Sequence, residues 1–242
     1  TVGPPLLRRL TNSELESSIG DIFPTIKAIG WAGVKLGVDP VSHMGFGNDA
    51  QVLQVNQQTA QEILDTAEDV ATYVTNAGIL PLVLPCSTFT PDRTCATTFV
   101  RDTGRRLFRR PLADSERNDY LGLYDSVKAK ADFASAIKWT LVAMIESPHS
   151  IYRSELGVAD GDGYGLTQHE LASELSYTFS GTTPSVALLD KADRGELSTP
   201  DVLLTEVKVL LAIPRGQEVV RQLFRSWFRY ERVAMVTRSD VP

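Results

Sequence analysis

The feature that most constrains this chain is its repeated set of helix-start signals. The sequences TNSE (residues 11–14) and TQHE (residues 167–170) fit the capping box, in which a threonine and a glutamate three residues later satisfy free backbone N–H groups. Pro184 and Pro200 each follow a threonine, and proline favours the first position of a helix. These signals predict helices along most of the chain.

Apolar spacing supports the same fold class. Apolar residues recur on one helical face within 57–74, 95–108, 133–145 and 219–228. No stretch alternates as a half-buried strand does, and only ILPLVL (79–84) is expected to form a short strand. We therefore expect an all-α fold of about eight or nine helices in an irregular bundle, with at most one short strand.

Composition and charge exclude some functions. With 242 residues, of which 43% are hydrophobic, the chain can bury a sizeable core. Its net charge of −6 argues against nucleic-acid binding, which needs a basic face. The longest apolar segment, 134–145, is interrupted by Lys138 and is shorter than the roughly 18 residues that a membrane span needs. We expect neither a nucleic-acid partner nor a membrane span.

The two cysteines bear on the compartment. Cys86 and Cys95 lack the additional ligands that a zinc site needs, and no haem-attachment motif is present. A disulfide between a loop and a helix start is the favoured interpretation, and two buried free thiols are the alternative. The chain begins at Thr1 without a signal sequence, which fits a mature exported product or a trimmed chain. We expect a periplasmic or extracellular location.

Three stretches carry a family resemblance. LRRLTNSELESSIGDIF (7–23), PCSTFTPDRTCATTFVRDTGRRLFRRPLADSE (85–116) and MIESPHSIYRSELG (144–157) resemble, in this order, modules of large secreted proteins of planctomycetes and myxobacteria. Those proteins consist of consecutive helical domains of unknown function, often associated with c-type cytochromes. The resemblance implies an exported protein and attaches no reaction to the modules. We expect modules at 1–80, 81–130 (with the disulfide) and 131–242, packed as one unit.

The segment SPHSIYRSELG (147–157) raises the question of an active site. A proline after a helix predicts a hinge, and Arg153 with Glu155 fits an ion pair that fixes this corner; a ligand-facing role is the alternative. Members of the resembled family usually have arginine where this chain has Glu174. If that arginine pairs with the glutamate of the YRSE stretch, which is Glu155 here, Glu174 would instead place two carboxylates together.

The other candidate residues each have a plain structural alternative. If the chain is an enzyme, which the sequence leaves uncertain, its catalytic residues would come from His43, Asp49, Arg153 and Glu155. Binding and metal candidates are the arginines of an FRRP turn, which suit an anionic ligand or simply a helix C-terminus, and the aspartates of DGDG, which suit a loose calcium site or a solvated turn. These residues are Arg109, Arg110, Asp160 and Asp162.

An aromatic helix near the end of the chain favours one function. Trp227, Phe228 and Tyr230 would need cover by another protein. The leading hypothesis is an exported scaffold or subunit of a larger assembly, with no cofactor of its own. Its partner would be another subunit, such as the remainder of a processed precursor or a haem-bearing c-type cytochrome. The alternatives are a redox or polysaccharide-active enzyme, and a calcium- or carbohydrate-binding module.

Overall fold

The computed structural model describes residues 6–42, 47–84, 86, 91–160 and 163–228. The helices in this part of the chain are α1 (Asn12–Ile22), α2 (Pro24–Ala28), α3 (Gln57–Val74), α4 (Leu80–Val83), α5 (Arg93–Phe108), α6 (Asp114–Lys128), α7 (Phe133–Glu146), α8 (Pro148–Ile151), α9 (Gln168–Ser180), α10 (Val186–Asp193), α11 (Pro200–Ala212) and α12 (Pro214–Phe228). The strands are β1 (Leu6–Arg9), β2 (Tyr152–Glu155), β3 (Val158–Asp160) and β4 (Gly163–Gly165).

The expected count of elements is wrong. The described residues form twelve helices and four short strands, instead of eight or nine helices with at most one strand. Part of the excess comes from α2, α4 and α8, which span only four or five residues each and carry a proline in the first turn. The expected strand at 79–84 is one of these short helices, because a proline in the first turn suits a helix start and removes a donor from a sheet.

The strands form two small antiparallel sheets. In the first, β1 pairs with β2 in a register that places Leu7 opposite Ser154 and Arg9 opposite Tyr152. In the second, β3 and β4 pair as neighbours in sequence. The first sheet therefore joins the N-terminal part of the chain to the segment that follows α8, more than 140 residues later.

The helix-start signals have mixed outcomes. Both capping boxes are present, with Thr11 and Thr167 as the capping residues of α1 and α9. Pro200 lies in the first turn of α11, as expected. Pro184 does not begin a helix, because α10 starts two residues later with the side chain of Ser185 as its cap.

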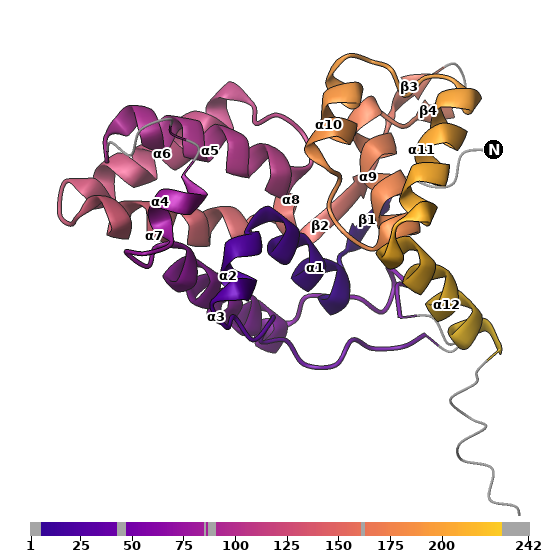
Figure 1. Ribbon diagram of the computed structural model, residues 1–242, viewed down its shortest axis with the longest axis horizontal. Helices are drawn as coiled ribbons and strands as arrows, with labels where there is room; N and C mark the ends of the chain where they lie inside the picture. The colour runs from indigo at the N-terminus through magenta and orange to yellow at the C-terminus, as the bar shows by residue number, and fades with distance from the viewer. Residues whose placement is uncertain (1–5, 43–46, 85, 87–90, 161–162, 229–242) are drawn as a thin grey trace, which may run out of the picture.

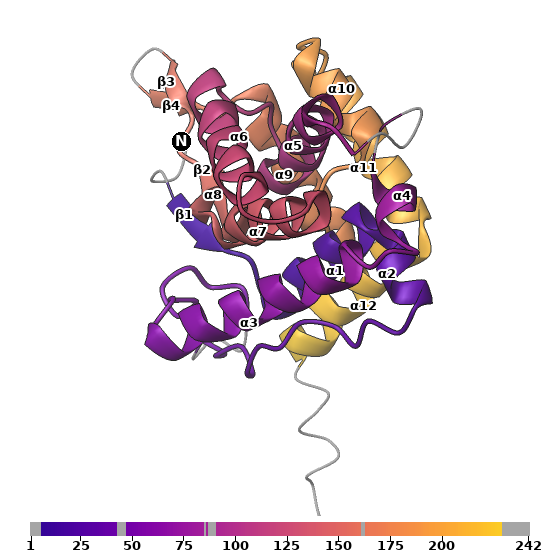
Figure 2. The same ribbon diagram turned by 90° about the vertical axis from the view of Figure 1, so that its left-hand side faces the viewer.

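Two groups of buried apolar side chains differ greatly in size. The larger group, called here the main core, is built mainly from α1, α2, α3, α5, α6 and α7, with Leu80 of α4 and Tyr177 of α9. The smaller one, called the C-terminal cluster, consists of Ala172, Leu188, Ala192 and Leu197. Figure 1 shows α5, α6 and α7 on one side and α9, α10 and α11 on the other, with α1 between them. In Figure 2, α3 runs along α7 and completes the larger half.

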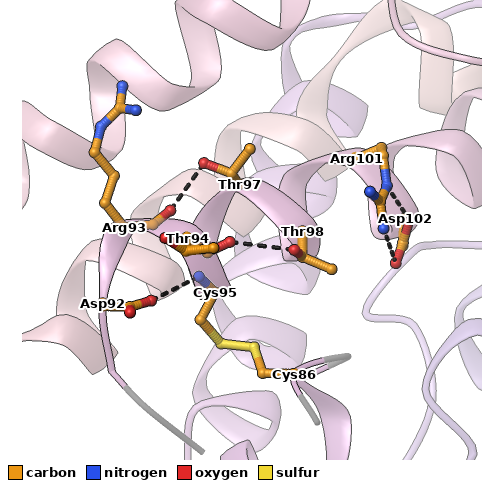
Figure 3. The surroundings of a disulfide bond; sticks show 9 residues. All are labelled: Cys86, Asp92, Arg93, Thr94, Cys95, Thr97, Thr98, Arg101 and Asp102. Atoms are coloured by element: carbon orange, nitrogen blue, oxygen red, sulfur yellow. Dashed lines mark hydrogen bonds and ion pairs between the residues drawn. A yellow bond between two sulfur atoms is a disulfide. The ribbon is translucent and has the colours of Figure 1, made fainter. Parts of the chain in front are cut away.

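The favoured pairing of the two cysteines is confirmed. Cys86 and Cys95 form a disulfide with their Cα atoms 5.6 Å apart. It ties the segment after α4 to the first turn of α5, where the side chain of Asp92 accepts a 2.8 Å hydrogen bond from the N–H of Cys95 (Figure 3). None of the helices described is both long and apolar enough to cross a membrane.

Candidate functional site

Arg109 holds the corner formed by residues 147–152. It ends α5 in the left-handed conformation, with φ of 59°, which is unusual for a residue with a side chain. Its buried guanidinium donates four hydrogen bonds of 2.6 to 3.1 Å to backbone carbonyls. The acceptors are the carbonyls of Leu107, His149, Ser150 and Tyr152. These bonds favour the strained backbone of Arg109 and hold the turn from α8 into β2.

Arg153, on β2, is buried between two carboxylates. Its side chain is almost inaccessible, at 2% of its full exposure. One of its terminal nitrogens, Nη2, lies 2.7 Å from Oε1 of Glu155 and 2.7 Å from Oε2 of Glu174. Arg8 lies 3.6 Å from the same oxygen of Glu155. The two carboxylates therefore meet at one guanidinium.

These two carboxylates have pKa values displaced in opposite directions. Burial is the largest effect at Glu155 and raises its pKa, because the attraction of Arg153 is offset by the charge of Glu174. Burial alone would also raise the pKa of Glu174, but the charge of Arg153 and hydrogen bonds from Thr178 and Arg153 outweigh it and hold that pKa below its usual value. The pair thus accommodates a proton on Glu155 more readily than on Glu174.

Tyr177 on α9 connects the two buried arginines. The guanidinium carbons of Arg109 and Arg153 lie 5.7 and 5.3 Å from the centre of its ring, within reach of a cation–π interaction. Its hydroxyl lies 2.9 Å from Oγ of Ser18 on α1, which also accepts a 3.1 Å hydrogen bond from the N–H of Thr183. This buried network joins α1, α5, β2 and α9.

A cavity of about 420 Å³ lies against the face of the first sheet that carries the paired residues Leu7 and Ser154. We call it the seam cavity. Its lining comes from β1, the end of α5, α8, β2 and the first two turns of α9. The lining residues are Leu7, Phe108, Arg109, Arg110, Pro148, His149, Tyr152, Ser154, Leu156, Thr167, His169, Glu170 and Ser173.

The charged groups on one side of the seam cavity are paired with Glu116. Arg110 donates two hydrogen bonds of 2.7 and 2.8 Å to this carboxylate, and Nε2 of His149 lies 3.2 Å from it. The hydrogen bonds from Arg110 are the main reason that the pKa of Glu116 falls to about 2. Burial, helped by the charge of Arg110, lowers the pKa of His149, so its imidazole is neutral at pH 7.

The charged groups on the other side of the seam cavity are paired as well. Nε2 of His169 lies 2.7 Å from the carboxylate of Asp193. The Glu170 carboxylate accepts five hydrogen bonds, from the hydroxyl of Ser154, the N–H groups of Leu156 and Gly157, and both the N–H and the hydroxyl of Thr167. These hydrogen bonds outweigh burial and lower the pKa of Glu170.

The residues considered as catalytic candidates do not all come together. Arg153 and Glu155 are paired with each other, and Arg109 and Arg153 both lie near the ring of Tyr177. Asp49 lies elsewhere in the chain and accepts a hydrogen bond from the N–H of Gln51 within its own turn. His43 is outside the described residues. A catalytic role for any of them remains a prediction.

The binding candidates are placed as follows. Arg110 and Arg109 both line the seam cavity, but the guanidinium of Arg109 is used by backbone carbonyls and that of Arg110 by Glu116. Asp160 ends β3, and Asp162 is outside the described residues. The described residues contain no group of three or more His, Cys, Asp or Glu side chains that could hold a metal ion.

The sequence interpretation did not identify the seam cavity. His149, His169 and Ser173 line it together with Glu170, yet these residues come from two helices without a shared motif. The one local signal was the second capping box. It identifies Glu170 as a carboxylate at the start of α9. It does not show that β2 and the residues just after it would supply further hydrogen-bond donors to this carboxylate.

Comparison with known proteins defines the class of the chain. Residues 8–76 match the family PSD3, described as a protein of unknown function (DUF1587). Residues 95–155 match the family PSD5 (DUF1595), and residues 166–241 match the family PSD4 (DUF1592). Both are also described as proteins of unknown function. The chain therefore consists largely of three consecutive domains of these families. No curated protein and no solved structure matches it.

Proposed function

We propose that the chain is an exported, non-catalytic scaffold subunit that binds another protein through the outer face of α12. The observation that carries this proposal is the exposure of large apolar side chains on that helix. Trp227 is 63% exposed and Phe228 55% exposed, and Leu223 and Phe224 are also exposed. Large contiguous apolar patches on a protein surface commonly mark binding sites.

The chemistry of the helix suits a protein partner. The rings of Phe224, Trp227 and Phe228 lie 5.3 to 6.3 Å from one another in stacked arrangements, so they form one continuous aromatic surface. Arg221 and Arg225 lie on the same helix and pair with Glu218. Aromatic residues and arginine are enriched at protein–protein interfaces and supply most of their binding energy. Tyr230, the third aromatic residue expected here, is outside the described residues.

Export is supported by the disulfide, because such bonds persist in oxidising compartments and are rare in the cytosol. The three consecutive domains of unknown function agree with a modular assembly. A c-type cytochrome or the remainder of a processed precursor is the partner that the resemblance suggests. A haem-bearing partner would place the chemistry of the assembly outside this chain.

Site-specific photo-crosslinking in the source cells tests the proposal. A photoreactive amino acid at Trp227 should give a discrete crosslinked species, and the same group at Leu82, an exposed apolar residue on α4, should not. Mass spectrometry and haem analysis of the crosslinked species then identify the partner. Equal crosslinking at both positions, or none at Trp227, would show that this face is not a docking site. A partner without haem would exclude the cytochrome but not the scaffold.

A further inference from the structure

We propose that the seam cavity binds a neutral, largely apolar small molecule with one hydroxyl or carbonyl group, about the size of a substituted phenol. This site is separate from the aromatic face of α12. Its volume of about 420 Å³ falls within the usual range of small-molecule sites, which often form between domains. The second and third matched regions, 95–155 and 166–241, both contribute to its lining.

The apolar part of the lining sets the body of the ligand. Leu7 and Leu156 are 55% and 44% exposed, although both belong to the lining. Phe108, which is buried, and Pro148, which is exposed, add apolar surface from α5 and α8. The ring of His149 lies 5.3 Å from that of Phe108. A ring-shaped apolar ligand would cover the exposed leucines and pack against flat side chains, and burial of apolar area favours binding.

The pairing of the charged groups excludes a formal charge on the ligand. Arg110 is neutralised by Glu116, His169 faces Asp193, and the Glu170 carboxylate is saturated by its five donors. An anion would have to displace a carboxylate from Arg110, and a cation would have to compete with five hydrogen bonds. A neutral molecule has neither cost.

Ser173 supplies the polar contact. It lies on α9, lines the seam cavity and is only 5% exposed. Its hydroxyl is buried and has no hydrogen-bond partner among the described residues, although buried hydroxyls normally have one. Rotation about χ1 moves a serine hydroxyl between staggered positions, so a ligand hydroxyl or carbonyl could satisfy it. This requirement selects one polar group on an otherwise apolar ligand.

Three related probes test the ligand class with the full chain at pH 7. They are p-cresol, which is neutral and has a hydroxyl; toluene, which lacks it; and 4-methylbenzoate, which is an anion. We expect p-cresol to bind and to shift the NMR signals of the His149 and His169 rings. Toluene should bind about fivefold more weakly, the usual worth of one neutral hydrogen bond. Absence of p-cresol binding, or tightest binding by 4-methylbenzoate, would overturn the proposal.

Two substitutions of Ser173 locate the binding. Ser173→Ala should weaken p-cresol about fivefold, to the level of toluene, and leave toluene unchanged. Ser173→Leu places a larger apolar side chain at the cavity wall and removes the hydroxyl, so it should weaken the binding of p-cresol more than Ser173→Ala does and should also weaken that of toluene. Ser126→Ala and Ser126→Leu make the same changes at an exposed position on α6 and should have no effect.

The aromatic face of α12 is the competing location for an apolar probe. Trp227→Ser removes a central ring from it and should leave p-cresol binding unchanged. If Trp227→Ser weakens binding and Ser173→Ala does not, the probe binds α12 and the proposal is wrong. Circular dichroism of each variant checks that it is folded, and Ser173→Ala, which removes one atom, keeps the test decisive if the leucine variant unfolds.

Discussion

The main core and the C-terminal cluster hold their parts of the molecule together in different ways. The main core gathers apolar side chains from eight helices, including Tyr177 of α9, and residues such as Phe99, Ile137 and Leu141 are completely buried there. The C-terminal cluster has four buried residues, from α9, α10 and the turn after α10. Since hydrophobic stabilisation scales with buried apolar area, α9 to α12 gain much less from their own packing.

The C-terminal helices are instead attached through polar contacts to the rest of the chain. Arg105 on α5 forms ion pairs with Asp190 and Asp193. Arg215 on α12 forms two hydrogen bonds to Asp21 on α1. Further contacts of this kind join Arg153 to Glu174, Tyr177 to Ser18, and Thr183 to both Ser18 and the Arg106 carbonyl.

This difference implies that the two halves respond to different perturbations. Apolar packing is insensitive to pH, whereas buried ion pairs depend on the protonation of their partners. A boundary built from charges can also open without exposing a large apolar surface. The C-terminal half, which supplies four of the thirteen residues that line the seam cavity, is therefore the part expected to loosen first.

The largest effect should come from truncating a side chain in the main core. We expect Phe99→Ala to lower the free energy of unfolding by about 3–5 kcal/mol, because it leaves a cavity that closely packed neighbours cannot fill. Leu188→Ala in the C-terminal cluster should cost about 2–3 kcal/mol and should open mainly α10 in hydrogen exchange. Urea unfolding measures both. Equal shifts of one shared transition would mean that the two groups act as a single core.

The next effect concerns the buried arginine between the halves. Arg153→Met should lower the free energy of unfolding by about 3 kcal/mol, because it removes the buried cation between two carboxylates and leaves only Arg8, beside Glu155, to offset their repulsion. Arg194→Met removes an exposed arginine that pairs with Glu196 and should leave stability nearly unchanged, because solvent screens exposed ion pairs. Urea unfolding at pH 7 compares them. Similar small losses in both variants would show that the boundary does not depend on this ion pair.

The disulfide should act on the larger half alone. Replacing both Cys86 and Cys95 by serine should cost about 2–3 kcal/mol, because the bond closes a short loop and restricts the unfolded chain. Hydrogen exchange should increase around α4 and the start of α5 and stay unchanged in α10. A reducing agent should destabilise the wild-type chain and leave the double variant unaffected. Faster exchange in α10 would indicate that the disulfide also supports the C-terminal half.

Local signals in the sequence predicted the long helices but not the short elements. The capping boxes at Thr11 and Thr167 mark true helix starts because they depend only on neighbouring residues. The first sheet was missed because its strands are four residues long and lie far apart in sequence, and their pairing is a tertiary effect. The helix at 80–83 was missed because short apolar runs suit either state.

The buried charges were only partly predictable. The pairing of Arg153 with Glu155 was favoured in the sequence analysis and is present, and Glu174 joins them as it would if it replaced an arginine that pairs with Glu155. That Arg109 would adopt a left-handed conformation and bind four carbonyls could not be predicted, because that position usually holds glycine. The seam cavity depends on how five separate elements meet, and no single motif records that arrangement.

The smallest effects should come from the two carboxylates at Arg153, and they should have opposite signs. The raised pKa of Glu155 means that its contribution to stability is complete below its unfolded pKa and is lost as pH rises through the folded value. Glu155→Gln stays neutral and keeps an oxygen acceptor, so it should be more stable than the wild type at pH 7, by less than about 1 kcal/mol. The advantage should disappear in acid.

Glu174→Gln should behave in the opposite way. The lowered pKa of Glu174 means that its contribution is present above its unfolded pKa and is lost as pH falls through the folded value. The variant should be less stable than the wild type at pH 7, by less than about 1 kcal/mol, and equal to it in strong acid. Thermal unfolding between about pH 3 and pH 7, the range over which such carboxyls titrate, measures both variants. Because the carboxylates share one guanidinium, the double variant should depart from the sum of the single effects. Additive effects of the same sign would mean that the boundary between the halves responds to net charge rather than to this pair.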